Sequence, residues 1–134
     1  MIYLDTDVLV NFLVVQNPDK HDLADSIYQK TAQEQSLFMS FLVLQEISFV
    51  LGKLNLPVVK IKAKVNALAL LRPYAYQLDE YRRAVNLAER IGFQHFNDCL
   101  HTAIAKKNCT ELFTFNKSDF AKIRSYTDLK IILL

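Results

Sequence analysis

The stretch Ile2–Leu13 (IYLDTDVLVNFL) constrains the fold most, because a strand-like run changes to a helical pattern at one acid. Ile2–Leu4 is short, apolar and strand-prone, which predicts a strand buried on both faces. Apolar residues then recur at helical spacing from Val8 to Leu13. Asp5 therefore lies where a strand ends and a helix begins, which is the edge where open α/β sheets bind ligands. The alternative is that Asp5 only caps the helix, with Thr6 as a helper.

The length of 134 residues predicts one domain, residues 1–134, with a single core. Only 2 Gly and 3 Pro are present, which argues against long linkers and against a β-sandwich with many tight turns. The net charge of +2 neither requires nor excludes nucleic acid as a partner. The sequence contains neither common Gly-rich phosphate loop, so it does not indicate a P-loop or dinucleotide-binding enzyme.

The cysteines and the apolar runs predict a cytoplasmic protein outside the membrane. Cys99 and Cys109 fit no zinc-binding spacing and are too few for a disulfide framework, which favours a reducing compartment. Asp5 interrupts the N-terminal run before the core of a signal peptide could form. The longest apolar stretch, Phe38–Leu51, contains polar residues and is too short to span a bilayer.

Strand-like and helix-like segments alternate along the chain. The expected strands are residues 2–4, 37–39, 74–76, 111–114 and 131–134. The expected helices follow Asp5 and Asn116 and also cover residues 17–35, 41–55, 58–72, 79–91 and 97–107, with Ser40 and Asp79 as caps. This alternation predicts an α/β fold with three α/β/α layers and a central, mostly parallel five-stranded sheet.

Glu46 lies within the segment Phe41–Asn55, which is apolar nearly all round and is therefore expected to be a largely buried helix. Its neighbours at spacings of three and four are apolar, among them Leu42 and Val50. A carboxylate there is costly unless it is paired, bound to a metal or facing a cleft. The alternative is a narrow solvent-exposed stripe shared with Lys53.

Further polar residues follow the same pattern. Asp98 begins one expected helix, and the turn Asn116–Asp119 follows an expected strand, although capping alone would also explain Asp98. If these positions meet Asp5 and Glu46 at one sheet edge, oxygen ligands converge there without His or Cys. Such a site suits Mg²⁺ or Mn²⁺ and not zinc, and its main use is phosphate chemistry.

The histidines do not form a metal-binding set by spacing. His101 lies three residues after Asp98 and is expected to line the crevice in a packing or ligand-supporting role. His21 and His95 are expected at the surface.

With these motifs in order, the chain resembles the PIN-domain family, and its short length resembles the VapC-type ribonuclease toxins of bacterial toxin–antitoxin pairs. The resemblance covers the whole chain and rests on four segments: LDTDVL from Leu4, Glu46, NDCLHTA from Asn97, and TFNKSDF from Thr114. It implies a metal-dependent endoribonuclease whose core acids are Asp5, Glu46, Asp98 and Asp119.

The same resemblance assigns supporting positions. Thr6 matches the small hydroxyl residue after the first Asp. Asn116 stands where many members have Asp, which leaves Asp119 as the expected fourth ligand. Asp7 stands where Asn or Ser is common, and it either adds charge to the site or points away as an ordinary first-turn acid.

The implied partners are an RNA substrate, a cognate antitoxin protein and a second copy of the chain. The helices at 17–35 and 58–72 carry more apolar residues than a small sheet needs, which supports a homodimer. Basic residues around 53–72 form either a solvated helix face or a rim that meets a phosphate backbone.

Two other functions remain open at this point. One is a catalytically inactive PIN-like module that binds RNA or acts in assembly. The other is a Mg²⁺-dependent phosphatase or phosphotransferase, although no nucleophilic-Asp motif with a downstream Lys is apparent.

Overall fold

The sheet has four parallel strands in the order β2-β1-β3-β4. The computed structural model describes residues 1–134, and its strands are β1 (Ile2–Leu4), β2 (Leu37–Phe38), β3 (Glu111–Thr114) and β4 (Lys130–Leu133). Ile2 pairs with Leu37 on one side and with Glu111 on the other. The chain thus leaves β1 toward one side for β2 and crosses to the other side for β3, which creates a switch point beside β1.

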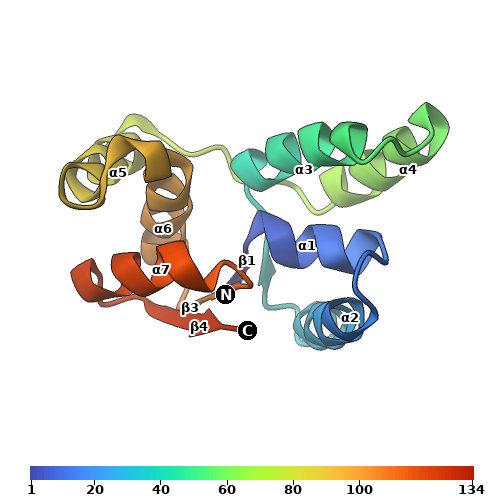
Figure 1. Ribbon diagram of the computed structural model, residues 1–134, viewed down its shortest axis with the longest axis horizontal. Helices are drawn as coiled ribbons and strands as arrows, with labels where there is room; N and C mark the ends of the chain where they lie inside the picture. The colour runs from blue at the N-terminus through green and yellow to red at the C-terminus, as the bar shows by residue number, and fades with distance from the viewer.

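Helices cover both faces of the sheet, so the predicted α/β class with three layers is confirmed. Figure 1 shows α1 to α4 on one side of the strands and α5 to α7 on the other. The helices are α1 (Thr6–Leu13), α2 (Pro18–Gln33), α3 (Phe41–Lys53), α4 (Val58–Ala69), α5 (Leu78–Ile91), α6 (Phe96–Asn108) and α7 (Lys117–Ile123), with short 3-10 turns η1 (Phe93–His95) and η2 (Arg124–Tyr126). One cluster of 24 buried residues forms the core between the layers.

The expected fifth strand at residues 74–76 is wrong. Only Tyr74 pairs, in a single parallel bridge with Ser40 at the edge beside β2. Pro73 has no N–H to extend the pairing. Glu80, fully buried, accepts hydrogen bonds from the Tyr74 hydroxyl and from the backbone N–H of Gln77, and so turns the chain into α5. The cap of α5 is therefore Gln77, in a capping box with Glu80, and not Asp79.

Helix α3 begins at its predicted cap, since Ser40 accepts a hydrogen bond from the backbone N–H of Val43. The helix is less buried than its composition predicted: Phe41 and Phe49 are 49% and 67% exposed. The reason is that α1 and α4 cover only part of α3. None of the helices combines the length and the apolar composition needed to cross a bilayer.

Candidate metal centre

Polar side chains gather at the carboxyl edge of the sheet, beside the switch point. Asp5 follows β1 and Asn116 follows β3, and these two strands are neighbours. Helix α6 brings Asp98 to the same edge, and α3 brings Glu46. These residues, with Asp7 and His101, line one pocket of about 340 Å³, which we call the acidic pocket; its lining is Asp5, Thr6, Asp7, Val10, Asn11, Gln16, Glu46, Val50, Asp98, His101 and Asn116.

Asp5 is held rigidly at the base of this pocket. It is 5% exposed and is the N-cap of α1, where Oδ1 accepts a hydrogen bond from the backbone N–H of Thr6 at 2.8 Å. Its Oδ2 accepts a hydrogen bond from the Thr114 hydroxyl at 2.8 Å. Capping and a role in the site are therefore compatible, because a cap at this strand end also fixes the carboxylate at the pocket.

Glu46 reaches the pocket from the second turn of α3. Its Oε1 accepts a hydrogen bond from the Thr6 hydroxyl at 3.2 Å and also pairs with Nε2 of His101. Its Oε2 makes no hydrogen bond within the protein, and the side chain is 27% exposed. Glu46 thus lines a pocket, which is one of the environments that the sequence analysis gave for a carboxylate on this apolar helix. One of its two oxygens remains without a hydrogen bond.

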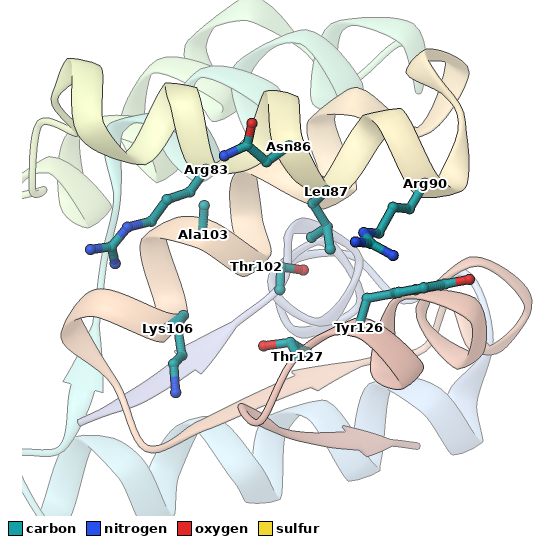
Figure 2. A pocket seen from close by; sticks show the side chains of 9 residues that line it. All are labelled: Arg83, Asn86, Leu87, Arg90, Thr102, Ala103, Lys106, Tyr126 and Thr127. Carbon is teal, nitrogen blue, oxygen red and sulfur yellow. The ribbon is translucent and has the colours of Figure 1, made fainter.

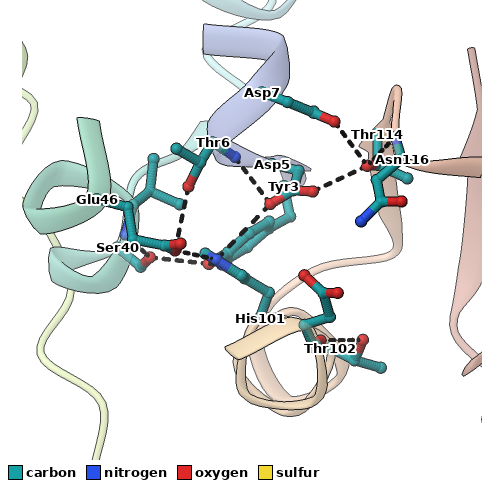
Figure 3. A network of polar contacts seen from close by, with 12 residues as sticks. Tyr3, Asp5, Thr6, Asp7, Ser40, Glu46, His101, Thr102, Thr114 and Asn116 are labelled. Atoms are coloured by element: carbon teal, nitrogen blue, oxygen red, sulfur yellow. Dashed lines mark hydrogen bonds and ion pairs between the residues drawn. The ribbon is translucent and has the colours of Figure 1, made fainter. Parts of the chain in front are cut away.

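His101 is buried, and both of its ring nitrogens have partners within the protein. Nδ1 lies 2.7 Å from the Tyr3 hydroxyl, which is 2.9 Å from the Ser40 hydroxyl, while Nε2 contacts Glu46 (Figure 3). Burial opposes protonation, but the charges of Asp5 and Glu46 outweigh it and raise the pKa of His101 above its usual value. With both ring nitrogens engaged, His101 fixes Glu46, which agrees with the supporting role expected from the sequence.

Asp98 has the least compensated charge in the pocket. Its carboxylate makes no hydrogen bond within the protein, and Asp5, Asp119 and Glu46 are close enough to act on it. Burial, and next the charge of Asp5, raise the pKa of Asp98 from 3.8 to about 7. His101 opposes this shift without reversing it. A partly buried carboxylate that accepts no hydrogen bond and lies beside other acids is an environment that a bound cation relieves.

Asp7 points into the site and does not turn away to solvent. It accepts hydrogen bonds from the backbone N–H of Phe115 at 3.2 Å and, more weakly, from the Thr114 hydroxyl at 3.4 Å. Burial and the nearby charge of Asp5 raise the pKa of Asp7 to about 7 despite these bonds. Asp7 therefore ties α1 to the turn after β3 and adds negative charge to the pocket.

Asp119 and Asn116 form one unit at the start of α7. Asn116 caps the helix, and its amide Nδ2 donates to Asp119 Oδ2 at 3.0 Å. Asp119 does not line the acidic pocket itself, but one of its oxygens lies within 4.8 Å of ligand atoms of Asp98 and His95. The predicted fourth acid therefore lies close to Asp98 but outside the lining of the acidic pocket.

His95 is a residue that the sequence reasoning placed wrongly at the surface. Its side chain is 18% exposed, and Nδ1 lies 3.5 Å from Asp119 Oδ1. His95 is the N-cap residue of α6 and lies two residues before the Asn97–Asp98 motif. This closeness in sequence was the signal that could have placed it near the site. His21 is also partly buried, with Nδ1 2.8 Å from the backbone oxygen of Asn11.

The chemistry of the side chains fits a divalent cation bound through oxygen. The carboxylate residues Asp5, Glu46 and Asp98 all line the acidic pocket, and no Lys or Arg lines it. Hard oxygen ligands of this kind suit Mg²⁺ or Mn²⁺. The group whose possible ligand atoms all lie within 4.8 Å of one another is Asp98 with Asp119 and His95, so Asp98 belongs both to this group and to the lining of the acidic pocket.

Comparison with known families agrees with this geometry. The sequence profile of the PIN domain matches residues 2–125. The chain therefore belongs to the PIN domain family, whose members are typically nucleases that use divalent metal ions. No curated protein compared with the chain matches it.

Proposed function

We propose that this protein is a Mg²⁺- or Mn²⁺-dependent endoribonuclease that hydrolyses RNA phosphodiester bonds. The observation that carries the proposal is Asp98, a partly buried carboxylate without a hydrogen-bond donor that faces Asp5 across the acidic pocket. Membership of the PIN domain family supports nuclease chemistry. We further propose that the substrate is RNA and that the ion is Mg²⁺ or Mn²⁺.

The residues have distinct roles in this proposal. Asp5, Glu46 and Asp98 hold the metal ion, and Asp119 completes the set from the side of α7. When bound, the ion supplies Lewis-acid activation of the phosphodiester and of the attacking water. Thr6 and Thr114 orient Asp5 and Glu46 by hydrogen bonds, as residues that support metal ligands commonly do.

The biological role that we propose is that of a toxin in a toxin–antitoxin pair, acting in the cytoplasm and neutralised by a cognate antitoxin. The resemblance to VapC-type toxins in length and motif order supports this role. A small reading frame immediately upstream of this one would support it further, and an isolated gene whose expression leaves growth unchanged would contradict it.

We also propose a homodimer. The outer side of α4 and the turn after it expose Val58, Val59, Leu70 and Leu71, of which Leu71 is the least exposed at 43%. Large apolar side chains exposed on one helix and on the turn that follows it favour an interface. A second copy is the proposed occupant, because the helices at 17–35 and 58–72 carry more apolar residues than the small sheet needs to cover it. Sedimentation velocity should show a dimer that Val59→Asp dissociates; a monomer at micromolar concentration would contradict the proposal.

The test of the enzymatic proposal compares substrates and acids. Single-stranded RNA should be cleaved internally with Mg²⁺ or Mn²⁺ and remain intact in EDTA, while a small phosphate monoester is not hydrolysed. Asp98→Asn should lower cleavage by at least about a hundredfold, since even supporting residues of metal sites cost 10- to 100-fold. The matched control is Asp22→Asn, an exposed acid on α2, which should cleave like the parent.

The same experiment separates the alternatives. Hydrolysis of the monoester without RNA cleavage would favour a phosphatase. RNA binding without metal-dependent cleavage would favour an inactive PIN-like module.

A further inference from the structure

A second pocket, with the opposite charge, lies between α5, α6 and the segment that follows α7. It has a volume of about 390 Å³, within the range of small-ligand sites. We call it the basic pocket; its lining is Arg83, Asn86, Leu87, Arg90, Thr102, Ala103, Lys106, Tyr126 and Thr127. No acid lines it, in contrast to the acidic pocket. Figure 2 shows Arg83 and Lys106 on one side of it, Arg90 and Tyr126 on the other, and Thr102 between them.

The cations of this pocket are largely free to bind an anion. Neither Arg83 nor Arg90 forms an ion pair within the protein, and only Lys106 has an acidic partner, Asp128, which is outside the lining. The amide of Asn86 makes no hydrogen bond within the protein. Arginines on a folded domain commonly pair with carboxylates, so these unpaired donors around one opening favour phosphate as the ligand.

The aromatic side of the pocket favours a nucleotide over a simple anion. Tyr126 is 50% exposed, and the guanidinium carbon of Arg90 lies 5.7 Å from the centre of its ring. An exposed ring supported in this way offers a surface on which a base can stack. An acidic peptide could pair with the cations of the pocket, but its carboxylates would not stack on the Tyr126 ring.

Helix α6 connects the two pockets. Thr102, only 2% exposed, forms part of the floor of the basic pocket and donates a hydrogen bond to the backbone oxygen of Asp98 at 2.8 Å. Lys106 follows Asp98 by eight residues, which is about 12 Å along a helix. At the stacked spacing of about 3.4 Å per nucleotide, that distance is about three to four nucleotides, so one strand can reach both pockets.

We propose that the basic pocket binds one nucleotide of the RNA strand whose phosphodiester lies in the acidic pocket: Arg83 and Lys106 hold the phosphate, and the base stacks on Tyr126. This inference rests on the proposed function for its substrate class. It adds a binding site whose charged and aromatic residues lie outside the sequence motifs. It also assigns affinity for RNA to residues that do not take part in the reaction.

The test measures RNA binding without cleavage. A fluorescein-labelled single-stranded RNA of about ten nucleotides is titrated with protein in EDTA, and fluorescence anisotropy gives Kd. Arg83→Ala and Tyr126→Ala should each weaken binding about five- to tenfold, while Tyr126→Phe keeps the stacking surface and binds within about twofold of the parent. Arg82→Ala is the matched control, because Arg82 is an exposed neighbour on α5 outside the lining.

Length and salt dependence sharpen the test. A dinucleotide cannot reach both pockets, so parent and Arg83→Ala should cleave it equally with Mg²⁺, whereas the longer RNA should show a raised KM in the variant. Loss of one phosphate contact should also reduce the slope of log K against log salt by about 0.7. The variants replace exposed residues, so circular dichroism should show the parent's fold in each.

The outcomes distinguish this inference from the proposed function. RNA binding that depends on Arg83 and Tyr126 without any cleavage would support the basic pocket and contradict the nuclease. Cleavage with unchanged binding in both variants would overturn the basic pocket alone. The inference is also overturned if a free nucleoside monophosphate binds as tightly as the RNA, or if Arg83→Ala abolishes binding of a poly-glutamate peptide but not of RNA.

Discussion

The acidic and basic pockets use the same helix in opposite ways. At the start of α6, Asp98 faces buried and half-buried acids that are held by hydrogen bonds, such as the bond from Thr114 to Asp5. Two turns later, Lys106 faces exposed arginines that have long, unpaired side chains. Crowded charges in fixed positions lower the stability of the fold, but they suit a reaction whose rate depends on geometry. Exposed charges lower the stability little and contribute to affinity for nucleic acid. In the functions that we propose, the residues for the reaction and the residues for RNA affinity therefore lie at opposite ends of α6.

The largest expected effect separates kcat from KM. Glu46→Gln removes a charge from the acidic pocket but keeps the shape of the side chain, so kcat for RNA cleavage should fall at least about a hundredfold. Arg83→Ala removes a contact that is equal in ground and transition states, so KM should rise about fivefold at unchanged kcat. Steady-state kinetics on one labelled RNA measure both constants.

The double variant provides the control. If the pockets act separately, the two changes in kcat/KM should multiply. A fall in kcat for Arg83→Ala comparable with that for Glu46→Gln would break the division between the two pockets.

The residues of the acidic pocket could be predicted because local sequence places them. Asp5 follows β1 directly and is the cap of the next helix, and Asn116, two residues after the end of β3, is the cap of α7. Once the strands are parallel, their ends must meet, and so the sequence alone brings these residues together. Glu46 was visible as a carboxylate on an apolar helix, although its link to His101 was not, since it joins residues 55 positions apart.

The basic pocket could not be predicted in the same way. Arg83 and Arg90 look like ordinary solvated residues of an amphipathic helix, and only the packing of α5 on α6 brings them to Lys106. Tyr126 comes from a third segment. The expected fifth strand failed for a related reason: the local pattern at Tyr74 is strand-like, but the buried Glu80 ends the pairing through contacts that the pattern does not show.

The next largest effect on cleavage concerns Asp119 and Asn116, at the edge of the acidic pocket. Asp119→Asn should lower cleavage about tenfold, because an ionised carboxylate binds Mg²⁺ more strongly than an amide. Asn116→Ser keeps a helix cap and should lower cleavage by about threefold or less. Rates under single-turnover conditions check the ranking. Equal losses would mean that Asn116 is as important as Asp119, either as a ligand or by holding it in place.

The smallest effect is on stability without metal. The folded protein raises the pKa of Asp98 from 3.8 to about 7, so the unfolded chain ionises this acid at a lower pH than the folded chain does. The resulting destabilisation is absent below pH 3.8, grows as pH rises, and is complete above pH 7. In EDTA at pH 8, Asp98→Asn should therefore melt about 3 to 6 °C above the parent, with less than half of that difference at pH 5.

The basic pocket supplies the matched control, since Arg83 is exposed and far from the crowded acids. Arg83→Ala should melt like the parent in EDTA at both pH values. Saturating Mg²⁺ or Mn²⁺ should stabilise the parent and Arg83→Ala alike by mass action, and Asp98→Asn much less. If Asp98→Asn instead melts below the parent in EDTA and gains as much from metal, the acids do not share a cation. The contrast between a strained acidic pocket and a relaxed basic one would then have no thermodynamic basis, because burying Asp98 beside Asp5 would carry no cost for a metal to relieve.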